Sequence, residues 1–293
     1  MKEIHYGGQA LIEGVMMRGS AHVALAVRNP KGEIVVHTEP LEGRIYRGFI
    51  ARTPFLRGLT MLWDSLVLGI RSYMFSADVA LGEEAGVSFS GPLAWGTLLG
   101  SLAIGVGLFF LLPVFLVRLV EHSLGSALGS NIVEGLARLV LFVGYIALVG
   151  LMPDIRRVFA YHGAEHKTIN AYEAGAPLDP DAVQAYGTAH VRCGTGFMLL
   201  VLVIFVALGS LLGRPPLPLR LLSRLVLIPI VAGLAYEVMK FGARHRNRPL
   251  VAILLAPNLW LQRLTTREPD RPMLEVAVTA LRKLLEVEQQ SLR

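Results

Sequence analysis

The hydrophobic positions of this chain gather into long, almost uncharged runs that alternate with mixed segments. The clearest run covers residues 93–117, which carry no charge and include Trp95 near one end. Further runs cover residues 132–152, 196–212 and 217–234, and only a short link separates the last two. A helix needs about 20 mostly apolar residues to cross a bilayer. The pattern therefore predicts about four transmembrane helices, the last two forming an antiparallel hairpin.

The pattern is different before the first long run. Residues 23–28 and 33–38 are β-rich and flank the turn-forming segment 29–32, which predicts a β-hairpin. Residues 53–75 form an amphipathic helical pattern with one narrow polar stripe and apolar residues on every other face. We expect that helix to lie in the cytoplasmic interface of a membrane, to pack on the bundle, or to be a core helix of the N-terminal region.

The C-terminal segment continues in shorter elements. Residues 250–261 are apolar but too few to span a bilayer, which predicts an interfacial or re-entrant piece, and residues 271–288 have the spacing of an amphipathic helix. The fold class is therefore mainly α, a polytopic helical membrane protein with a small N-terminal cytoplasmic α+β region. We divide the chain into an N-terminal region at 1–92, a membrane domain at 93–234 and a cytoplasmic C-terminal region at 235–293.

Composition supports a membrane protein and excludes other classes. Hydrophobic residues make up 53% and charged residues 17%, whereas an ordinary soluble domain has roughly 25% charged residues. Intrinsically disordered chains have low hydrophobicity and many charges, so this composition excludes intrinsic disorder. The single cysteine, Cys193, excludes a disulfide scaffold. The net charge is +6, but the sequence has no dense run of basic residues with aromatic residues between them. We therefore expect no nucleic-acid partner.

The distribution of basic residues predicts the orientation. Residues 1–92 hold nine Lys and Arg, residues 153–195 four, and residues 235–293 ten, which leaves five of the 28 at the opposite helix ends. Basic residues favour the cytoplasmic side of a membrane. We therefore expect a multi-pass protein of the cell membrane in contact with lipids, with both termini and the 153–195 loop in the cytoplasm. The pattern leaves the oligomeric state open.

The strongest chemical signal is the H-x-x-E-H pattern of His162, Glu165 and His166. The surrounding sequence predicts a helix that starts near Pro153 and stops at Gly175. One turn apart on that helix, the two imidazoles could bind one divalent ion, zinc being the first choice, with Glu165 as general base. The alternative is a cytoplasmic helix end whose histidines bond loops or lipid phosphates.

A catalytic ion needs a third protein ligand, and the topology limits the choice to the cytoplasmic face. His190, just before the third apolar run, is the first candidate. Glu173 is the second, since it shares the helical face of His166 but lies about 10 Å further along the axis. Further candidates near that surface are Arg192, Cys193 and Glu237, although a lone cysteine is more often a buried apolar thiol.

A second signal lies near the N-terminus. Residues 6–19, YGGQALIEGVMMRG, contain four glycines around Glu13 and Arg18. Glycine permits close backbone approach and positive φ. The segment is therefore interpreted either as a binding loop that uses Glu13 and Arg18 or as a tight structural turn leading into the hairpin.

Several blocks together resemble a known family. They are YGGQALIEGVMMRG, RTPFLRGL, YHGAEHKTINAYEAG, HVRCGTGF and APNLWLQRLTTREP, in this order over essentially the whole chain. On these blocks the chain resembles the YqhQ-like family of bacterial membrane proteins. The resemblance implies a predicted metal-dependent enzyme whose substrate and reaction are not known.

Two hypotheses of function follow. The first is a membrane-embedded, metal-dependent hydrolase whose site faces the cytoplasm at the bilayer surface, which suits a lipid-linked or membrane-protein substrate. The second is a non-enzymatic membrane protein for lipid binding, transport or assembly. The second draws on the blocks outside the histidine motif, which have no evident role in hydrolysis.

Overall fold

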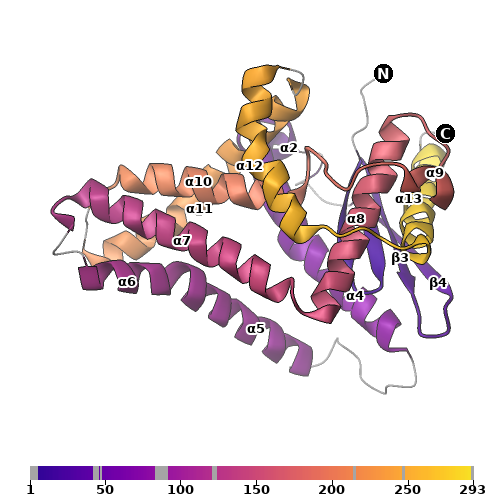
Figure 1. Ribbon diagram of the computed structural model, residues 1–293, viewed down its shortest axis with the longest axis horizontal. Coiled ribbons are helices and arrows are strands. Elements are labelled where there is room, and N and C mark those ends of the chain that lie inside the picture. The colour runs from indigo at the N-terminus through magenta and orange to yellow at the C-terminus, as the bar shows by residue number, and fades with distance from the viewer. Residues whose placement is uncertain are drawn as a thin grey trace.

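The computed structural model shows an elongated chain with a helical bundle at one end and a small sheet covered by helices at the other (Figure 1). The residues that it describes are 6–41, 46, 48–82, 92–120, 124–213, 216–245 and 248–291.

The sheet is an antiparallel meander in the order β1-β2-β3-β4. The predicted hairpin is confirmed as β3 (His22–Arg28) and β4 (Ile34–Pro40). Two further strands, β1 (Gly7–Leu11) and β2 (Gly14–Arg18), occupy the glycine-rich segment that we interpreted as a loop or a tight turn. Glycine lowers the strand propensity of that segment, and the strands form there because β2 pairs along β3 over five residues.

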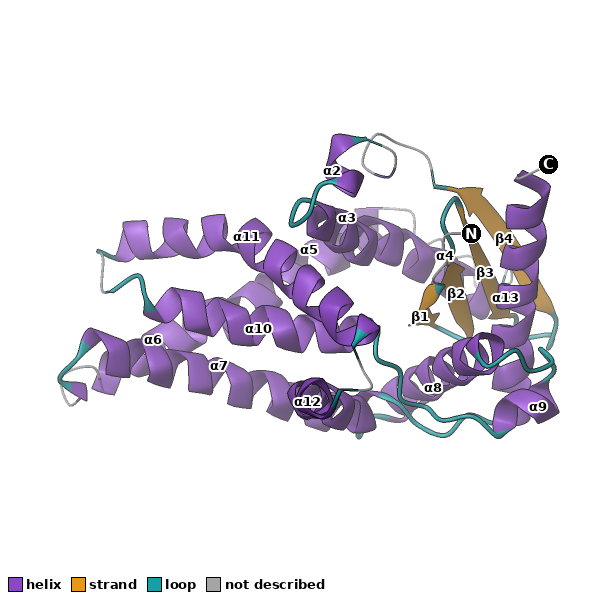
Figure 2. Cartoon of the chain, turned by 90° about the horizontal axis from the view of Figure 1, so that it is seen from above, coloured by secondary structure: helices purple, strands orange, loops and turns teal. Residues whose placement is uncertain are grey.

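Helices cover both faces of the sheet (Figure 2). Alternate side chains of β2 point to opposite sides, as the pleat requires. Val15 and Met17 share one core with α8 (Pro153–Glu173) and α13 (Arg271–Ser291). Met16 lies in a second core on the other face, against the helical segment that precedes and includes α4 (Gly69–Leu81). The sheet is therefore the middle layer of three.

The predicted C-terminal amphipathic helix is confirmed as α13, whose apolar stripe is mostly buried against the sheet and α8. The N-terminal strands, the middle of the chain and the C-terminal helix thus share one hydrophobic core. The domain limits at residues 92 and 234 remain a prediction.

The bundle contains the apolar runs found in the sequence. A continuous helix is formed by α5 (Pro92–Val106), the π-helical segment η3 (Gly107–Leu111) and α6 (Leu112–Val120). The others are α7 (Ala127–Val149), α10 (Gly194–Ser210) and α11 (Leu217–Arg244). Within the described parts of the chain, three segments are long and apolar enough to cross a membrane, namely Leu99–Val120, Leu128–Val149 and Leu222–Arg244, whereas α10 is apolar but shorter. Three of the four predicted spans therefore have sufficient length.

The amphipathic segment at 53–75 connects the bundle to the sheet. It contains α3 (Arg57–Trp63), η1 (Asp64–Leu68) and α4, preceded by the short α2 (Phe49–Arg52). α3 packs on α11, where a Cβ on Gly58 would lie 2.6 Å from the carbonyl oxygen of Ala232. α4 packs on β1 and β3. The helix therefore packs on the bundle at its start and on the sheet core at its end.

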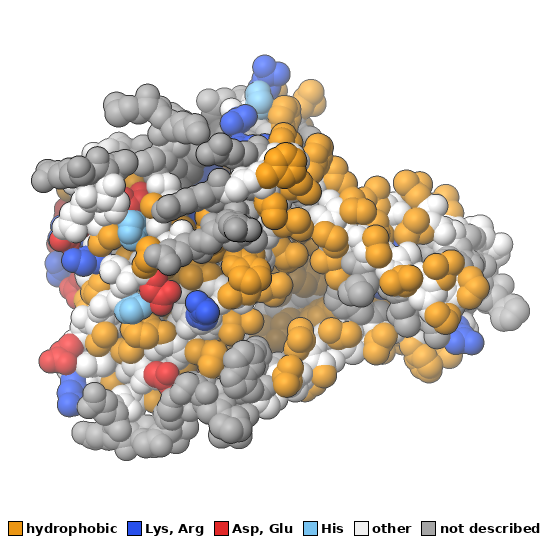
Figure 3. All heavy atoms as spheres, turned by 180° about the vertical axis from the view of Figure 1, so that it is seen from behind, with side chains coloured by type: hydrophobic (Ala, Val, Ile, Leu, Met, Phe, Trp, Pro, Cys, Tyr) orange, Lys and Arg blue, Asp and Glu red, His pale blue; other side chains and the backbone are white. Residues whose placement is uncertain are grey.

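The remaining apolar segment forms α12 (Pro249–Thr265), longer than the predicted 250–261. It runs across the bundle axis at the junction with the sheet layers and contacts α7, α10 and α11 (Figure 1). Apolar side chains cover much of the bundle surface in the view from behind (Figure 3).

Candidate metal centre

The H-x-x-E-H motif lies on α8, and the predicted helix is confirmed with its end signals. Pro153 occupies the first turn, and Asp154 lies beside it where a negative charge favours the helix N-terminus. Gly175 follows the helix end with a φ of 72°, a left-handed conformation that glycine adopts without strain. The motif therefore lies on a rigid helix rather than on a loop.

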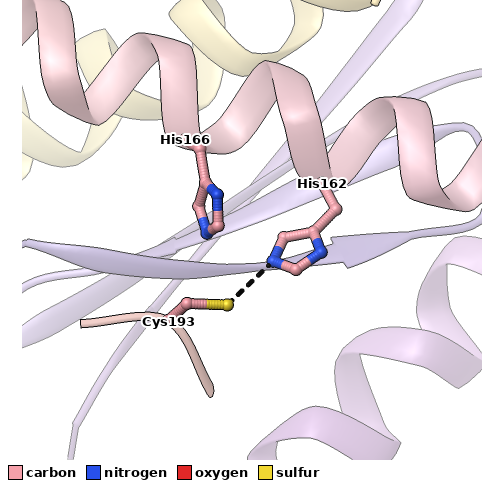
Figure 4. Close-up of side chains that lie close together, drawn as sticks. All are labelled: His162, His166 and Cys193. Atoms are coloured by element: carbon pink, nitrogen blue, oxygen red, sulfur yellow. Dashed lines mark hydrogen bonds between the residues drawn. The ribbon is translucent and has the colours of Figure 1, made fainter. Parts of the chain in front are cut away.

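Three side chains with metal-binding atoms meet at the motif (Figure 4). The Sγ of Cys193 lies 3.3 Å from the Nε2 of His162, and one ligand atom each from His162, His166 and Cys193 lies within 4.8 Å of the others. His166 and Cys193 are 1% and 4% exposed. Since Cys193 is the residue before α10, the cluster joins α8 to one end of the bundle.

Backbone carbonyls fix the orientation of both imidazoles. The Nδ1 of His162 donates to the carbonyl oxygen of Thr265 at 2.8 Å, and the Nδ1 of His166 donates to that of Thr188 at 2.6 Å. A carbonyl only accepts hydrogen bonds, so both Nδ1 atoms carry the proton in the neutral rings. Each Nε2 lone pair is then available to a metal, and such a second partner is what metal-binding histidines usually have.

Glu165 lies beside the two rings in a buried position. Its Oε2 is 3.6 Å from the Nε2 of His166 and 4.0 Å from that of His162. Burial raises the pKa of Glu165, and electrostatic interactions with His162, His190 and Arg192 oppose the increase. A Cβ on Gly8 of β1 would lie 2.7 Å from the Cγ of Glu165, so the absence of a side chain at Gly8 makes room for the Glu165 side chain.

The first two candidates for the third ligand lie near the cluster, but among the described residues neither belongs to the group of close metal-binding atoms. The backbone N–H and carbonyl of His190 bond the Gln262 side chain, and its Nε2 lies 3.7 Å from the Oε2 of Glu173. Glu173 also pairs with Arg192, and the proximity of His190 and Arg192 lowers the pKa of Glu173 to about 2. The third ligand stays a prediction, for which the geometry favours Cys193.

Three other candidates are held by ion pairs of their own. Glu13, with a φ of 51° at the β1–β2 turn, binds Arg157 through both carboxylate oxygens. The other pairs are Arg18 with Asp64 and Glu237 with Arg57. Among the described residues, none of these three side chains belongs to the group of close metal-binding atoms.

Sequence reasoning missed the residues that support the site. A Cβ on Gly163 would lie 2.0 Å from the carbonyl oxygen of Arg267, so this glycine lets the α12–α13 linker cross α8. Gln262 fixes the backbone of His190, and the hydroxyl of Thr195 lies 2.9 Å from the Sγ of Cys193. A glycine inside a helical motif was the available signal, because it costs helix stability unless packing requires it.

The donor set fits a borderline divalent ion. Zinc binds histidine nitrogen at about 2.0–2.1 Å and thiolate at about 2.3 Å, which places tetrahedral ligand atoms about 3.3–3.6 Å apart. A nitrogen–sulfur pair belongs at the upper end of that range, about 3.6 Å, so the observed 3.3 Å between Cys193 and His162 is slightly shorter. All three ligand atoms lie within 4.8 Å of one another, so a small adjustment would place them around one ion. Imidazole with thiolate favours zinc over magnesium or calcium.

The fold and the cluster define a mostly helical protein with an apolar bundle, a small covered sheet and a buried His/His/Cys group. The chain belongs to the family described as "Protein of unknown function (DUF1385)", whose model matches residues 53–287. It is similar to the uncharacterized protein YqhQ of Bacillus subtilis (strain 168), with 35% identity over 296 residues that cover 97% of this chain and 93% of that protein. The resemblance seen in the sequence blocks is thereby confirmed. No solved structure matches the chain.

Proposed function

We propose that the chain is a multi-pass membrane protein that binds one divalent ion, zinc first, through His162, His166 and Cys193 and acts as a hydrolase. The observation that carries the proposal is the pair of Nδ1 bonds to the carbonyls of Thr265 and Thr188. They leave two Nε2 atoms beside one thiol, an arrangement that a purely structural helix end would not need.

Three protein ligands leave a fourth position for water or substrate, as in catalytic zinc sites. A bound ion would supply Lewis-acid activation of that water at neutral pH. Glu165 is close to both Nε2 atoms, and its Oε2 is the nearest carboxylate oxygen for holding a proton during the reaction. Its raised pKa suits a group that takes up and returns a proton.

The membrane part of the proposal rests on exposed apolar surface. Leu102, Ile104, Val140 and Leu148 are between 61% and 71% exposed on helices of the bundle. Soluble proteins rarely expose such large contiguous apolar patches. A lipid environment around the bundle removes that cost, and the excess of basic residues in the terminal regions supports a cytoplasmic location for the sheet and the site.

The position of the cluster suggests the substrate class. Cys193 directly precedes the apolar helix α10, so the ligands lie at the end of the bundle rather than far from it. A membrane-linked substrate, either a lipid-linked molecule or a membrane protein, could reach this place from the bilayer surface.

Metal analysis of the purified full chain tests the proposal. We expect about one zinc per chain, and loss of the ion in His166→Ala and Cys193→Ser because two ligands hold it weakly. Glu165→Gln should retain the ion, since this residue is not a proposed ligand. His37→Ala, which alters an exposed histidine on β4, is the matched control and should also retain it.

Cobalt substitution separates ligand loss from misfolding. Cobalt bound to the wild-type chain should show a thiolate charge-transfer band, and Cys193→Ser should lose the band while keeping the helical circular-dichroism spectrum. Wild-type protein that contains no stoichiometric metal, and whose melting temperature does not change with added zinc, would refute the proposal.

A further inference from the structure

A second polar site lies at the start of α8, away from the histidine cluster. An open cavity of about 530 Å³ lies between the first turns of α8 and the linker that leads into α13. Its walls are formed by Pro153, Arg156, Arg157, Ala160, Arg267, Glu268 and Met273. Three of these seven side chains carry guanidinium groups.

The acids near the cavity already have partners. Glu268 forms an ion pair with Lys167 at 2.6 Å, and Glu13 pairs with Arg157. Asp270, the other nearby acid, caps α13 by accepting the N–H of Met273 at 2.9 Å. The Glu13 contact occupies Arg157, and Lys167 neutralises Glu268, so Arg156 and Arg267 are the arginines of the cavity wall that a ligand could bind.

The remaining positive charge is held at the cavity wall. Arg267 donates to the carbonyl oxygens of Arg263 and Thr266, two neutral acceptors that fix its position without neutralising it. Arg156 is exposed, and among the described residues no hydrogen bond or ion pair involves its side chain. The cavity therefore presents one fixed and one free guanidinium group beside Arg157.

This site is distinct from the candidate metal centre. Successive residues of a helix are rotated by about 100°, so His162 lies about 240° around α8 from Arg156 and about 140° from Arg157. The cavity and the histidines thus occupy different faces of one helix. A ligand in the cavity would not need the metal.

The surroundings indicate what kind of anion could bind. α8 begins four residues after α7 ends at Val149, a candidate membrane span, and the connecting residues Leu151 and Met152 are 72% and 52% exposed. Guanidinium groups bind phosphate with paired, charge-assisted hydrogen bonds.

We infer that Arg156 and Arg267, on the wall of this cavity beside the Glu13-paired Arg157, bind a phosphate-bearing anion, either the headgroup of an acidic phospholipid or a free phosphate compound. The inference goes beyond the proposed hydrolase and is independent of it. Loss of the metal by His166→Ala should leave this binding unchanged.

Calorimetric titration of the full chain in neutral detergent micelles tests the inference. The probes are dioctanoyl phosphatidate, dioctanoyl phosphatidylcholine and inorganic phosphate. We expect Arg156→Ala to weaken binding of phosphatidate by about 10-fold or more, the effect of losing a charge-assisted pair. Arg282→Ala, an exposed arginine on α13 away from the cavity, should change binding less than about 2-fold and controls for general electrostatics.

The outcomes distinguish the sources of the anion. Binding of phosphatidate without measurable binding of inorganic phosphate supports a lipid headgroup, and comparable binding of both supports recognition of the phosphate group alone. Arg156→Lys should retain part of the affinity because it keeps the charge but loses the planar fork. Absence of binding by both anions, or equal losses in Arg156→Ala and Arg282→Ala, would overturn the inference.

Discussion

Glu288 on α13 holds the β2–β3 turn, and its removal gives a measurable test of how the sheet is attached. Its Oε1 accepts the backbone N–H of Ser20 at 2.6 Å and that of Ala21 at 2.9 Å, and its Oε2 accepts the hydroxyl of Tyr6 at 3.3 Å. A Cβ on Gly19 would lie 2.2 Å from the same carboxylate, so the turn approaches it closely. The residue is only 4% exposed.

Glu288→Ala removes the acceptor from these donors. Ser20 is exposed, so water can replace the carboxylate there, and the cost falls mainly on Ala21 and Tyr6. A buried donor left without a partner costs about 1–3 kcal/mol, and the hydroxyl bond is long, so we expect a loss of about 2–3 kcal/mol in the free energy of unfolding. For a chain of this size that corresponds to a decrease of about 4–10 °C in melting temperature.

Thermal unfolding of the full chain in detergent, monitored by circular dichroism, measures this decrease. Glu286→Ala is the matched control, because Glu286 lies on the same helix, is exposed and makes only surface contacts with Lys283 and Gln290. Such a surface pair contributes at most about 0.5 kcal/mol. If both variants melt within about 2 °C of each other, Glu288 does not anchor the turn and the reasoning is refuted.

Two further predictions concern topology and the site. A single cysteine placed at Asp181 in a Cys193→Ser background should react with an impermeant thiol reagent only after cells are opened, because the 153–195 loop is predicted to be cytoplasmic; labelling of intact cells would contradict the orientation. Gly8→Ala should lower the melting temperature by several degrees, because the new Cβ would lie 2.6 Å from the carbonyl oxygen of Met16 and 2.7 Å from the Cγ of Glu165. Gly7→Ala is the control and should have little effect, because a Cβ at that position meets no atom within 4 Å.

Long periodic patterns predicted their elements well, because burial enforces them over many residues. The helix that carries His162 and His166 was found from its end signals, and the amphipathic C-terminal helix from its apolar spacing. In α13 buried residues recur on one face over most of the helix, so the local sequence contains most of the required information. In α8 the first seven residues are not buried and residues 160–171 are buried on nearly every side, so its end signals were the informative feature.

Elements that depend on distant partners were not predictable in this way. β1 is rich in glycine and gains its strand conformation by pairing with β2, and the turn between them places Glu13 at a positive φ. Cys193 gave no local sign of its neighbours. Its loop reaches the histidines because Gln262 binds the backbone of His190 and Asn170 donates to the carbonyl oxygen of Ala189, contacts separated by 72 and 19 residues.

The glycine within the histidine motif shows how blocks far apart in the sequence serve one site. Gly163 allows the linker after α12 to touch α8, since a Cβ there would lie 2.0 Å from the carbonyl oxygen of Arg267. Two residues earlier, at the last residue of α12, the carbonyl oxygen of Thr265 accepts the Nδ1 proton of His162. A side chain at position 163 would therefore push away the group that orients His162. The motif depends on this glycine and on the distant block around Thr265 as much as on its two histidines.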